Sequence, residues 1–250
     1  MATIAIKFGA YEFEDRVESC QYRGEVQIDA ANVPKRPGQI ITGGKISVRE
    51  YELRGSIVGT TATDVRDQID EMFAAIVNVT GNLFLFSDRY IEARLASFTM
   101  AYVEGSAMEV VDFSLIFRST LPFEVSADIE TVNLTTTTAS NQETTVTNDG
   151  NTEAYAVITV TAPSSPAINN DCTITNVTRD ESFQYLGIIA VTKSLIVDST
   201  VVPFSVENDG TSDIANFSGQ VIKLDPGANT IRINAVVGAA LSVAFRHTYK

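Results

Sequence analysis

One amphipathic helix set among strand-like segments constrains the fold of this chain more than any other feature. Between residues 63 and 79 the apolar side chains fall on a single helical stripe, formed by Val65, Ile69, Met72, Phe73 and Ile76. Thr63 or Asp64 can cap the start of this helix, and Gly81 is expected to end it. Almost every other segment alternates apolar and polar residues with period two. The sequence therefore predicts a mainly β protein with a single α-helix, at about 64–79.

A first domain is expected over residues 1–125, because strand-like runs enclose the helix on both sides. A polar loop with several Pro and Gly residues is expected at 32–44. In the run 46–58 the alternation slips near Glu50, which indicates a β-bulge. The expected strands of this domain are 3–8, 24–28 and 46–58 before the helix, and 83–86, 90–98, 100–103 and 108–117 after it.

The composition changes between residues 126 and 142, where four consecutive threonines occur at 135–138. This segment is predicted to be an extended Thr-rich linker or, alternatively, an edge strand of a second domain. The second domain, 143–250, has no helical pattern. Short strand-like runs are expected at 144–147, 154–161, 172–177, 183–189, 195–198, 202–206, 221–224, 230–235 and 241–245. Turn signals such as Asn148-Asp-Gly and Asn208-Asp-Gly separate these runs. Such spacing is typical of an antiparallel β-sandwich.

Composition and charge restrict the classes of function. The 250 residues carry a formal net charge of −13, which disfavours tight nucleic-acid binding because phosphate contacts need Lys and Arg. No apolar run approaches the roughly 20 residues of a membrane-spanning helix. The first residues lack the basic and apolar regions of a signal peptide, so folding in a cytoplasm is expected. Cys20 and Cys172 lie far apart and are interpreted as two buried or semi-buried free thiols.

No catalytic, cofactor-binding or metal-binding residue is predicted, and the chain is not expected to be an enzyme. His247 is the single histidine and no Ser or Cys lies in a nucleophile-elbow context, so His247 is interpreted as a surface or sheet-edge residue. The segment 38–45 has glycines at the wrong spacing for a phosphate loop and is interpreted as a glycine-rich loop. Asp149 and Asp209 lie in turns that do not satisfy the calcium-loop pattern.

Carbohydrate binding is the main alternative, since a two-domain β-rich chain can serve as an adhesin or a carbohydrate-binding module. Sugar platforms use exposed aromatic side chains, above all Trp, which is absent from this chain. The aromatic residues of the second domain alternate as core residues would: Phe183, Tyr185, Phe204, Phe217 and Phe245. The pattern therefore favours burial of these rings over exposure to a glycan.

The order of elements resembles the distal tail protein (Dit) family of long-tailed, siphovirus-type bacteriophages. No single motif is diagnostic; the succession of segments carries the resemblance over nearly the whole chain. The chain departs from the family, which often has a Trp near its Pro-aromatic pair, in having Phe123-Glu-Val there. The segments that carry the resemblance are 36–44, 51–57, 64–79, 81–86, 90–95 and 113–123 in the first domain, and 146–155 and 224–231 in the second.

The resemblance implies a structural virion protein of the tail tip. The first domain would be a tail-tube-like β-sandwich that forms a ring, typically a hexamer, around a channel through which DNA passes. The second would be a galectin-like sandwich that projects outward as a docking point. The implied partners are further copies of the chain, the tail tube protein, a tail-tip fibre or lysin protein, and receptor-binding proteins. Assembly in the host bacterial cytoplasm, without membrane insertion, is also implied.

Overall fold

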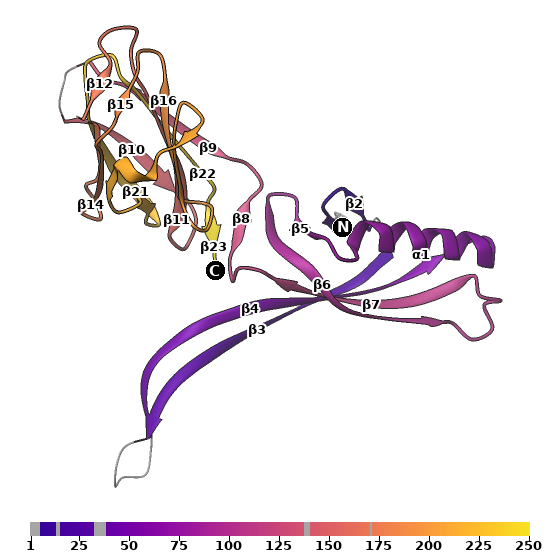
Figure 1. The fold of residues 1–250 in the computed structure, drawn as a ribbon. Coiled ribbons are helices and arrows are strands. Elements are labelled where there is room, and N and C mark those ends of the chain that lie inside the picture. Colours follow the sequence, from indigo (N-terminus) through magenta and orange to yellow (C-terminus); the bar gives the residue numbers. More distant parts are fainter. Residues whose placement is uncertain (1–5, 14–15, 33–38, 138–140, 171) are drawn as a thin grey trace. The chain divides into compact units, whose positions relative to one another are not determined.

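The structure, a computed structural model, is mainly β with one α-helix, as the sequence predicts (Figure 1). It describes residues 6–13, 16–32, 39–137, 141–170 and 172–250, and for 23–32 and 39–48 only the backbone. Two compact units divide the chain, Met1–Glu124 and Val125–Lys250. Within the described residues, no helix is both long and apolar enough to cross a bilayer.

The strands of the first unit belong to one antiparallel sheet, which has the order β2-β1-β5-β6-β7-β4-β3. Phe8 near one end of this order packs on Phe117 of a central strand, with ring centroids 4.9 Å apart, so the sheet curls over its own core. The elements of this unit are β1 (Lys7–Phe8), β2 (Tyr11–Glu12), β3 (Val17–Asn32), β4 (Gln39–Val58), α1 (Ala62–Ile76), β5 (Thr80–Phe86), β6 (Arg89–Tyr102) and β7 (Val110–Ser119).

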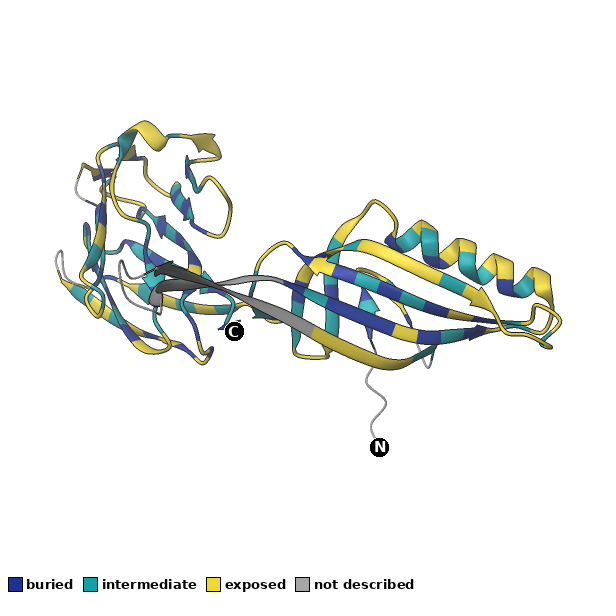
Figure 2. Cartoon of the chain, turned by 90° about the horizontal axis from the view of Figure 1, so that it is seen from below, coloured by how far each residue is buried: buried dark blue, intermediate teal, exposed yellow. Residues whose placement is uncertain are grey.

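Helix α1 buries the predicted apolar stripe against the sheet. Val65, Met72 and Ile76 are fully buried, and Ile69 and Phe73 pack partly buried against the same core. Burial of a side chain of this size stabilises a fold by roughly 1.5–3 kcal/mol. The opposite face of the helix is exposed, as the alternating colours along it show (Figure 2).

The ends of α1 differ from the prediction by a few residues. The N-cap is Thr61, whose side chain accepts a hydrogen bond from the Asp64 N–H, so neither Thr63 nor Asp64 is the cap. The prediction that Gly81 ends the helix is wrong. Asn78, with φ of 61°, takes the left-handed conformation just after the helix, and Gly81 lies within β5. A Cβ at Gly81 would lie 3.0 Å from the Phe8 ring, so packing explains this glycine.

Strands β3 and β4 continue beyond the sheet as a two-stranded ribbon, which we call the hairpin arm (residues 23–32 and 39–49; Figure 1). The loop predicted at 32–44 is therefore wrong for residues 39–44, and the glycine-rich loop is wrong for 39–45, because these residues pair with β3. Residues 33–38 lie outside the described residues. Backbone pairing holds the ribbon, so it needs no apolar alternation. The bulge predicted near Glu50 is confirmed. The register of the β3–β4 pair shifts between Gly24 and Val26, which lie opposite Arg49 and Ile46 of β4.

The second unit is a β-sandwich, whose core lies between two sheets. These have the orders β10-β21-β13-β14-β19 and β18-β17-β16-β11-β22-β9. Its elements are β8 (Glu124–Ser126, which begins in the first unit), β9 (Glu130–Thr135), β10 (Gln142–Asn148), β11 (Ala154–Thr161), β12 (Ile168–Asn169), β13 (Cys172–Asn176), β14 (Glu181–Tyr185), β15 (Ile188–Ile189), β16 (Ser194–Asp198), β17 (Ser205–Asn208), β18 (Thr211–Ser212), η2 (Ile214–Asn216), β19 (Phe217–Gly219), β20 (Lys223–Leu224), β21 (Gly227–Asn234), β22 (Ala240–Phe245) and β23 (Thr248–Tyr249).

The segment 126–142 contributes to this sandwich. Strand β9 pairs in register with β22 and forms the edge of its sheet, as in the pairs Val132–Val243 and Leu134–Leu241. Val132 and Leu134 pack against the core of the unit. Residues 138–140 lie outside the described residues, so the threonine run is described only to Thr137.

Candidate functional site

The convex side of the first unit is polar. We call "polar face" the side of β6, β7 and β4 that points away from the core. Cross-strand register fixes its membership, because directly opposite residues of antiparallel strands point to the same side. Where these three strands pair with one another, its described residues are Arg94, Ser97, Thr99 and Ala101 on β6, Val110, Asp112, Ser114, Ile116 and Arg118 on β7, Glu50, Glu52, Arg54, Ser56 and Val58 on β4, and Glu18, which is bonded to Ser56.

Carboxylates hold two arginines of the polar face. Arg118 donates from Nε and Nη2 to one oxygen of Glu50, at 3.0 and 2.6 Å. Arg54 lies 2.7 Å from Oε1 of Glu52, which also accepts a hydrogen bond from Ser114. The hydrogen bond to Glu52 raises the pKa of Arg54. The polar face therefore presents guanidinium groups whose charge is already balanced within the sheet.

The sheet of the first unit has two unlike open edges. Strand β5 pairs only with the first part of β6, up to Arg94, while β7 follows β6 to Tyr102. On its other side, residues 95–102 have no pairing strand among those described; we call this segment the β6 edge. At the opposite end, β3 pairs with β4 alone. Unpaired edges of this length are templates for a further strand.

Hydrogen-bonding groups on the β6 edge point outward at alternate residues. The Val103 N–H bonds to Val110 O of β7 at 3.0 Å, so by alternation the N–H groups of Phe98, Met100 and Tyr102 face away from β7. Large apolar side chains beside this edge are exposed. Phe98 and Tyr102 are each 52% exposed, although the Phe98 ring also packs on Phe73 of α1. The edge therefore combines free backbone groups with apolar surface.

A buried polar network lies on the core side of the sheet, where the hairpin arm begins. Arg49 lies 3.1 Å from Glu124 and 3.4 Å from the Tyr51 hydroxyl, and its guanidinium lies over the Tyr22 ring. The Tyr51 hydroxyl also donates to Glu124 at 3.1 Å. Burial is the main cause of the raised pKa of Tyr51. This network anchors the base of the arm to the end of the first unit.

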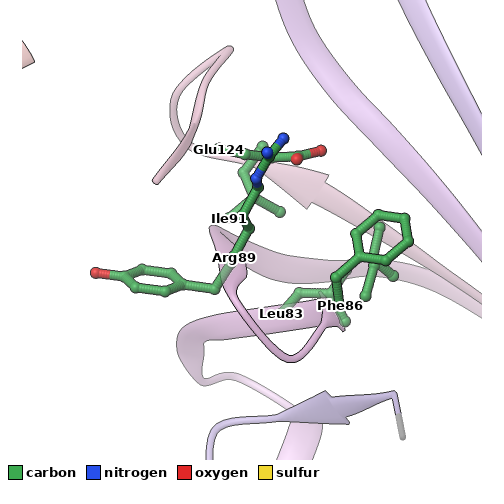
Figure 3. A pocket seen from close by; sticks show the side chains of 7 residues that line it. Leu83, Phe86, Arg89, Ile91 and Glu124 are labelled. Carbon is green, nitrogen blue, oxygen red and sulfur yellow. The ribbon is translucent and has the colours of Figure 1, made fainter. Parts of the chain in front are cut away.

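A shallow pocket that leaves no room for a whole water molecule lies at the β5–β6 hairpin (Figure 3). Mostly apolar side chains line it, with Arg89 and Glu124 at its edge. Sites for small molecules usually enclose about 300–1,000 Å³. This pocket is accordingly too small to be a substrate site.

The structure places the sequence candidates of the second unit in supporting roles. His247 accepts a hydrogen bond on Nδ1 from the Asp149 N–H at 3.0 Å, and its Nε2 lies 3.0 Å from Glu130. The Asp209 carboxylate lies 3.0 Å from Lys193 Nζ. Neither arrangement brings a nucleophile to a base. Among the described residues, no three His, Cys, Asp or Glu side chains form a cluster that could hold a metal ion.

The aromatic residues of the second unit are mainly core. Phe183, Tyr185 and Phe245 are buried, and Phe204 and Phe217 pack against them partly buried, as predicted. The Tyr185 hydroxyl donates to Asp213 and accepts from Asn208 Nδ2. Burial, followed by the bond to Asp213, raises the pKa of Tyr185 to about 12. The same bond, followed by one from Asn216, lowers the pKa of the Asp213 carboxyl.

The two cysteines form no disulfide, lie in different units and differ in burial. Cys172 is buried in the core of the sandwich. Cys20 is exposed on β3, so the prediction of a buried or semi-buried thiol is wrong for this residue. Its position on an edge strand explains the difference, because one flank of that strand has no neighbour to cover it.

Comparisons with known proteins give no sequence match. Neither a protein-family model nor a curated protein matches the chain. Among solved structures, the chain is similar to the SPP1 Dit (gp 19.1) protein, described as a paradigm of the hub adsorption apparatus in phages that infect Gram-positive bacteria. The two share 15% identity, with a TM-score of 0.75 over 96% of this chain and 97% of that one.

Two further matches are chains of the phage P2 baseplate in its activated conformation. The form with Ca gives a TM-score of 0.47 at 9% identity, and the form with Sr gives 0.45 at 10%; each match covers 96% of this chain and 90% of that one. These scores are too low to carry an argument. The similarity to the SPP1 protein extends over both units, so the resemblance to a Dit-like fold is confirmed.

Proposed function

We propose that this chain is a structural component of a bacteriophage tail tip, a distal tail protein that acts as a hub and has no enzymatic activity. The observation that carries the proposal is the match in fold to SPP1 Dit over 96% of the chain. That protein is described as part of a hub adsorption apparatus. The described residues, in which no nucleophile and base meet, are consistent with a structural role.

The open edges support assembly into a ring, which we propose has six copies. One open edge lies along residues 95–102 of β6, beyond the reach of β5, and the other lies along β3. A contact between these two different edges is heterologous, or head-to-tail. Such contacts close into rings when the rotation between subunits allows it. Pairing β3 of one copy with the β6 edge of the next would satisfy the outward N–H groups of Phe98, Met100 and Tyr102 and cover the apolar side chains beside them.

The polar face supports the wall of a central channel. In a ring of curled sheets, one side must face the lumen, and this side carries polar and small side chains besides Val58, Val110 and Ile116. Its described carboxylates, Glu18, Glu50, Glu52 and Asp112, outnumber its arginines, Arg54, Arg94 and Arg118. Repulsion from such a wall would let DNA pass without binding it.

We further propose that residues 1–125 form the ring, that 126–142 lead out of it, and that the galectin-like sandwich of 143–250 docks other proteins of the tip. The partners would be the tail tube protein on one side of the ring, and a fibre, lysin or receptor-binding protein on the other. The protein would be located at the tail tip of the virion after assembly in the bacterial cytoplasm.

Size-exclusion chromatography with light scattering tests the proposal directly. The purified chain should form a multi-subunit species, or approach one as its concentration rises. Electron micrographs of that species viewed end-on should show a ring with a central opening. A chain that stays monomeric at high concentration and binds glycans on an array would support the adhesin alternative instead.

A further inference from the structure

The arginines of the polar face are placed as a phosphate-binding surface would need them. Arg94 and Arg118 are direct cross-strand partners on β6 and β7, so their Cβ atoms lie about 4.5–5.5 Å apart. The Arg118 side chain is 60% exposed and that of Arg54 is 54% exposed. Neighbouring guanidinium groups of this kind bind phosphate oxygens with paired hydrogen bonds.

Carboxylates occupy the positions that phosphates would take. Arg118 of β7 lies between Arg94 of β6 and Glu50 of β4. One carboxylate oxygen of Glu50 accepts two hydrogen bonds from the Arg118 guanidinium. Glu52 holds Arg54 in the same way and is itself fixed by Ser114. Because the like charges of Arg94 and Arg118 are directly opposite, Glu50 also relieves a repulsion across the strands.

Stability alone does not account for the pair Arg118–Glu50, whose side chains are 60% and 34% exposed. An ion pair between exposed side chains contributes about 0–1 kcal/mol to folding, because water screens the attraction. Its effect on binding is larger, since each arginine that contacts a phosphate releases about one counterion and strengthens binding accordingly. An arginine whose guanidinium is already paired with a carboxylate does not contact a phosphate and so releases no counterion.

We propose that Glu50 and Glu52 are internal counterions that mask a latent nucleic-acid phosphate site on the polar face. The masking is a property of the single chain. Its purpose, to keep DNA from adhering to the wall it passes, rests on the channel role proposed above.

The test is the affinity of the full chain for a short fluorescent DNA duplex at low salt. The double variant Glu50→Gln, Glu52→Gln keeps the side-chain shapes and raises the formal net charge from −13 to −11 (−13 + 2). It should bind the duplex about tenfold more tightly than the control described below, and its binding should depend more steeply on salt, by up to about two counterions.

The matched control is Asp70→Asn, Glu71→Gln, which makes the same change in net charge on the exposed face of α1. Adding Arg118→Ala to the Glu50, Glu52 variant should abolish the gain. The proposal is overturned if the double variant binds no more tightly than the control, or if the gain survives Arg118→Ala. Light scattering on the same samples distinguishes the masking proposal from the ring proposal. A chain that stays monomeric but gains DNA binding would refute the ring and leave the masking supported.

Discussion

The imidazole of His247 joins two distant parts of the second unit by accepting a hydrogen bond from the Asp149 N–H at 3.0 Å. Asp149 lies in the turn after β10, whereas His247 lies near the end of the chain between β22 and β23. The other ring nitrogen lies 3.0 Å from Glu130 of β9. The His247 side chain thus connects three segments of the second unit, and its role there is structural.

Replacing His247 by Ala should lower the free energy of unfolding of the second unit by about 1–3 kcal/mol, because the Asp149 N–H and Glu130 both lose a partner. His247→Asn, which keeps an acceptor and a donor on a short side chain, should lower it less. Urea denaturation measured by circular dichroism compares the three proteins. Equal stability of His247→Ala and the original chain would contradict this role.

The buried hydroxyl of Tyr185 should make stability depend on pH in the alkaline range. Its pKa rises from 10.0 to about 12 on folding, so the folded state favours the protonated form. This contribution is complete below pH 10 and is lost as the pH rises from 10 through about 12. Tyr185→Phe should therefore flatten the fall in unfolding free energy across that window. Urea titrations at several pH values measure the slope, and identical slopes would rule the explanation out.

The first turn of α1 should depend on Thr61 and on ionised Asp64. Thr61→Ala removes the N-cap acceptor and should cost about 1 kcal/mol of stability. The Thr60 N–H, followed by Gln68, lowers the pKa of the Asp64 carboxyl below 3.8, so its contribution is present above that pH and is lost as the pH falls through the lowered value. Thermal melts between neutral and acidic pH should show this loss, and Asp64→Asn should remove it.

The β6 edge should control assembly. Tyr102→Pro removes an outward N–H without breaking a bond to β7, and should shift the protein from the multi-subunit species towards monomer. Tyr102→Ala, which keeps the N–H, is the matched control for the lost side chain. Light scattering reports the mass, and circular dichroism checks that both variants are folded. If the Pro variant assembles as well as the Ala variant, this backbone group takes no part in the contact.

Positive charge on the polar face should slow the passage of DNA. Asp112 is exposed there, opposite Ser56 of β4, and Asp112→Lys reverses one charge per copy. Virions with this variant should form rings normally but release DNA more slowly, because the wall then attracts phosphates. Asp70→Lys on α1 is the control. Unchanged ejection kinetics and infectivity in the Asp112 variant would argue against a channel at this face.

Residue patterns predicted local structure well where side chains meet a core. The stripe from Val65 to Ile76 gave the helix, and the run 154–161 coincides with strand β11, Ala154–Thr161. A strand predicted at 202–206 begins instead at Ser205, because Val202 is 98% exposed and satisfies no core position. An apolar run alone does not distinguish a strand from an exposed loop.

Features that depend on pairing between distant strands could not be predicted. The alternation of Glu52, Arg54 and Ser56 indicates a polar side, but the meeting of Glu50 with Arg118 depends on the register in which β4 and β7 pair. The strands predicted at 24–28 and 46–58 include part of the hairpin arm, but the sequence predicts a loop at residues 39–45, because backbone bonds, and no apolar alternation, hold the ribbon there. The β6 edge is open because β5 begins only at Thr80, opposite Arg94, and so does not reach residues 95–102. No residue pattern predicts this limit.

The difference between the β6 edge and the β3 edge affects how many copies of the chain could assemble. Two copies that joined through β3 of one and the β6 edge of the other would still leave one β3 and one β6 edge unpaired. A dimer would therefore not use up the edges that form this contact. In the proposed ring, addition would stop only when the last copy met the first, and the bend of the sheet between its two open edges would decide when that happens. The curvature of the sheet in one chain would then set the number of subunits in the proposed ring, and a variant that flattens the sheet should yield larger rings or open filaments.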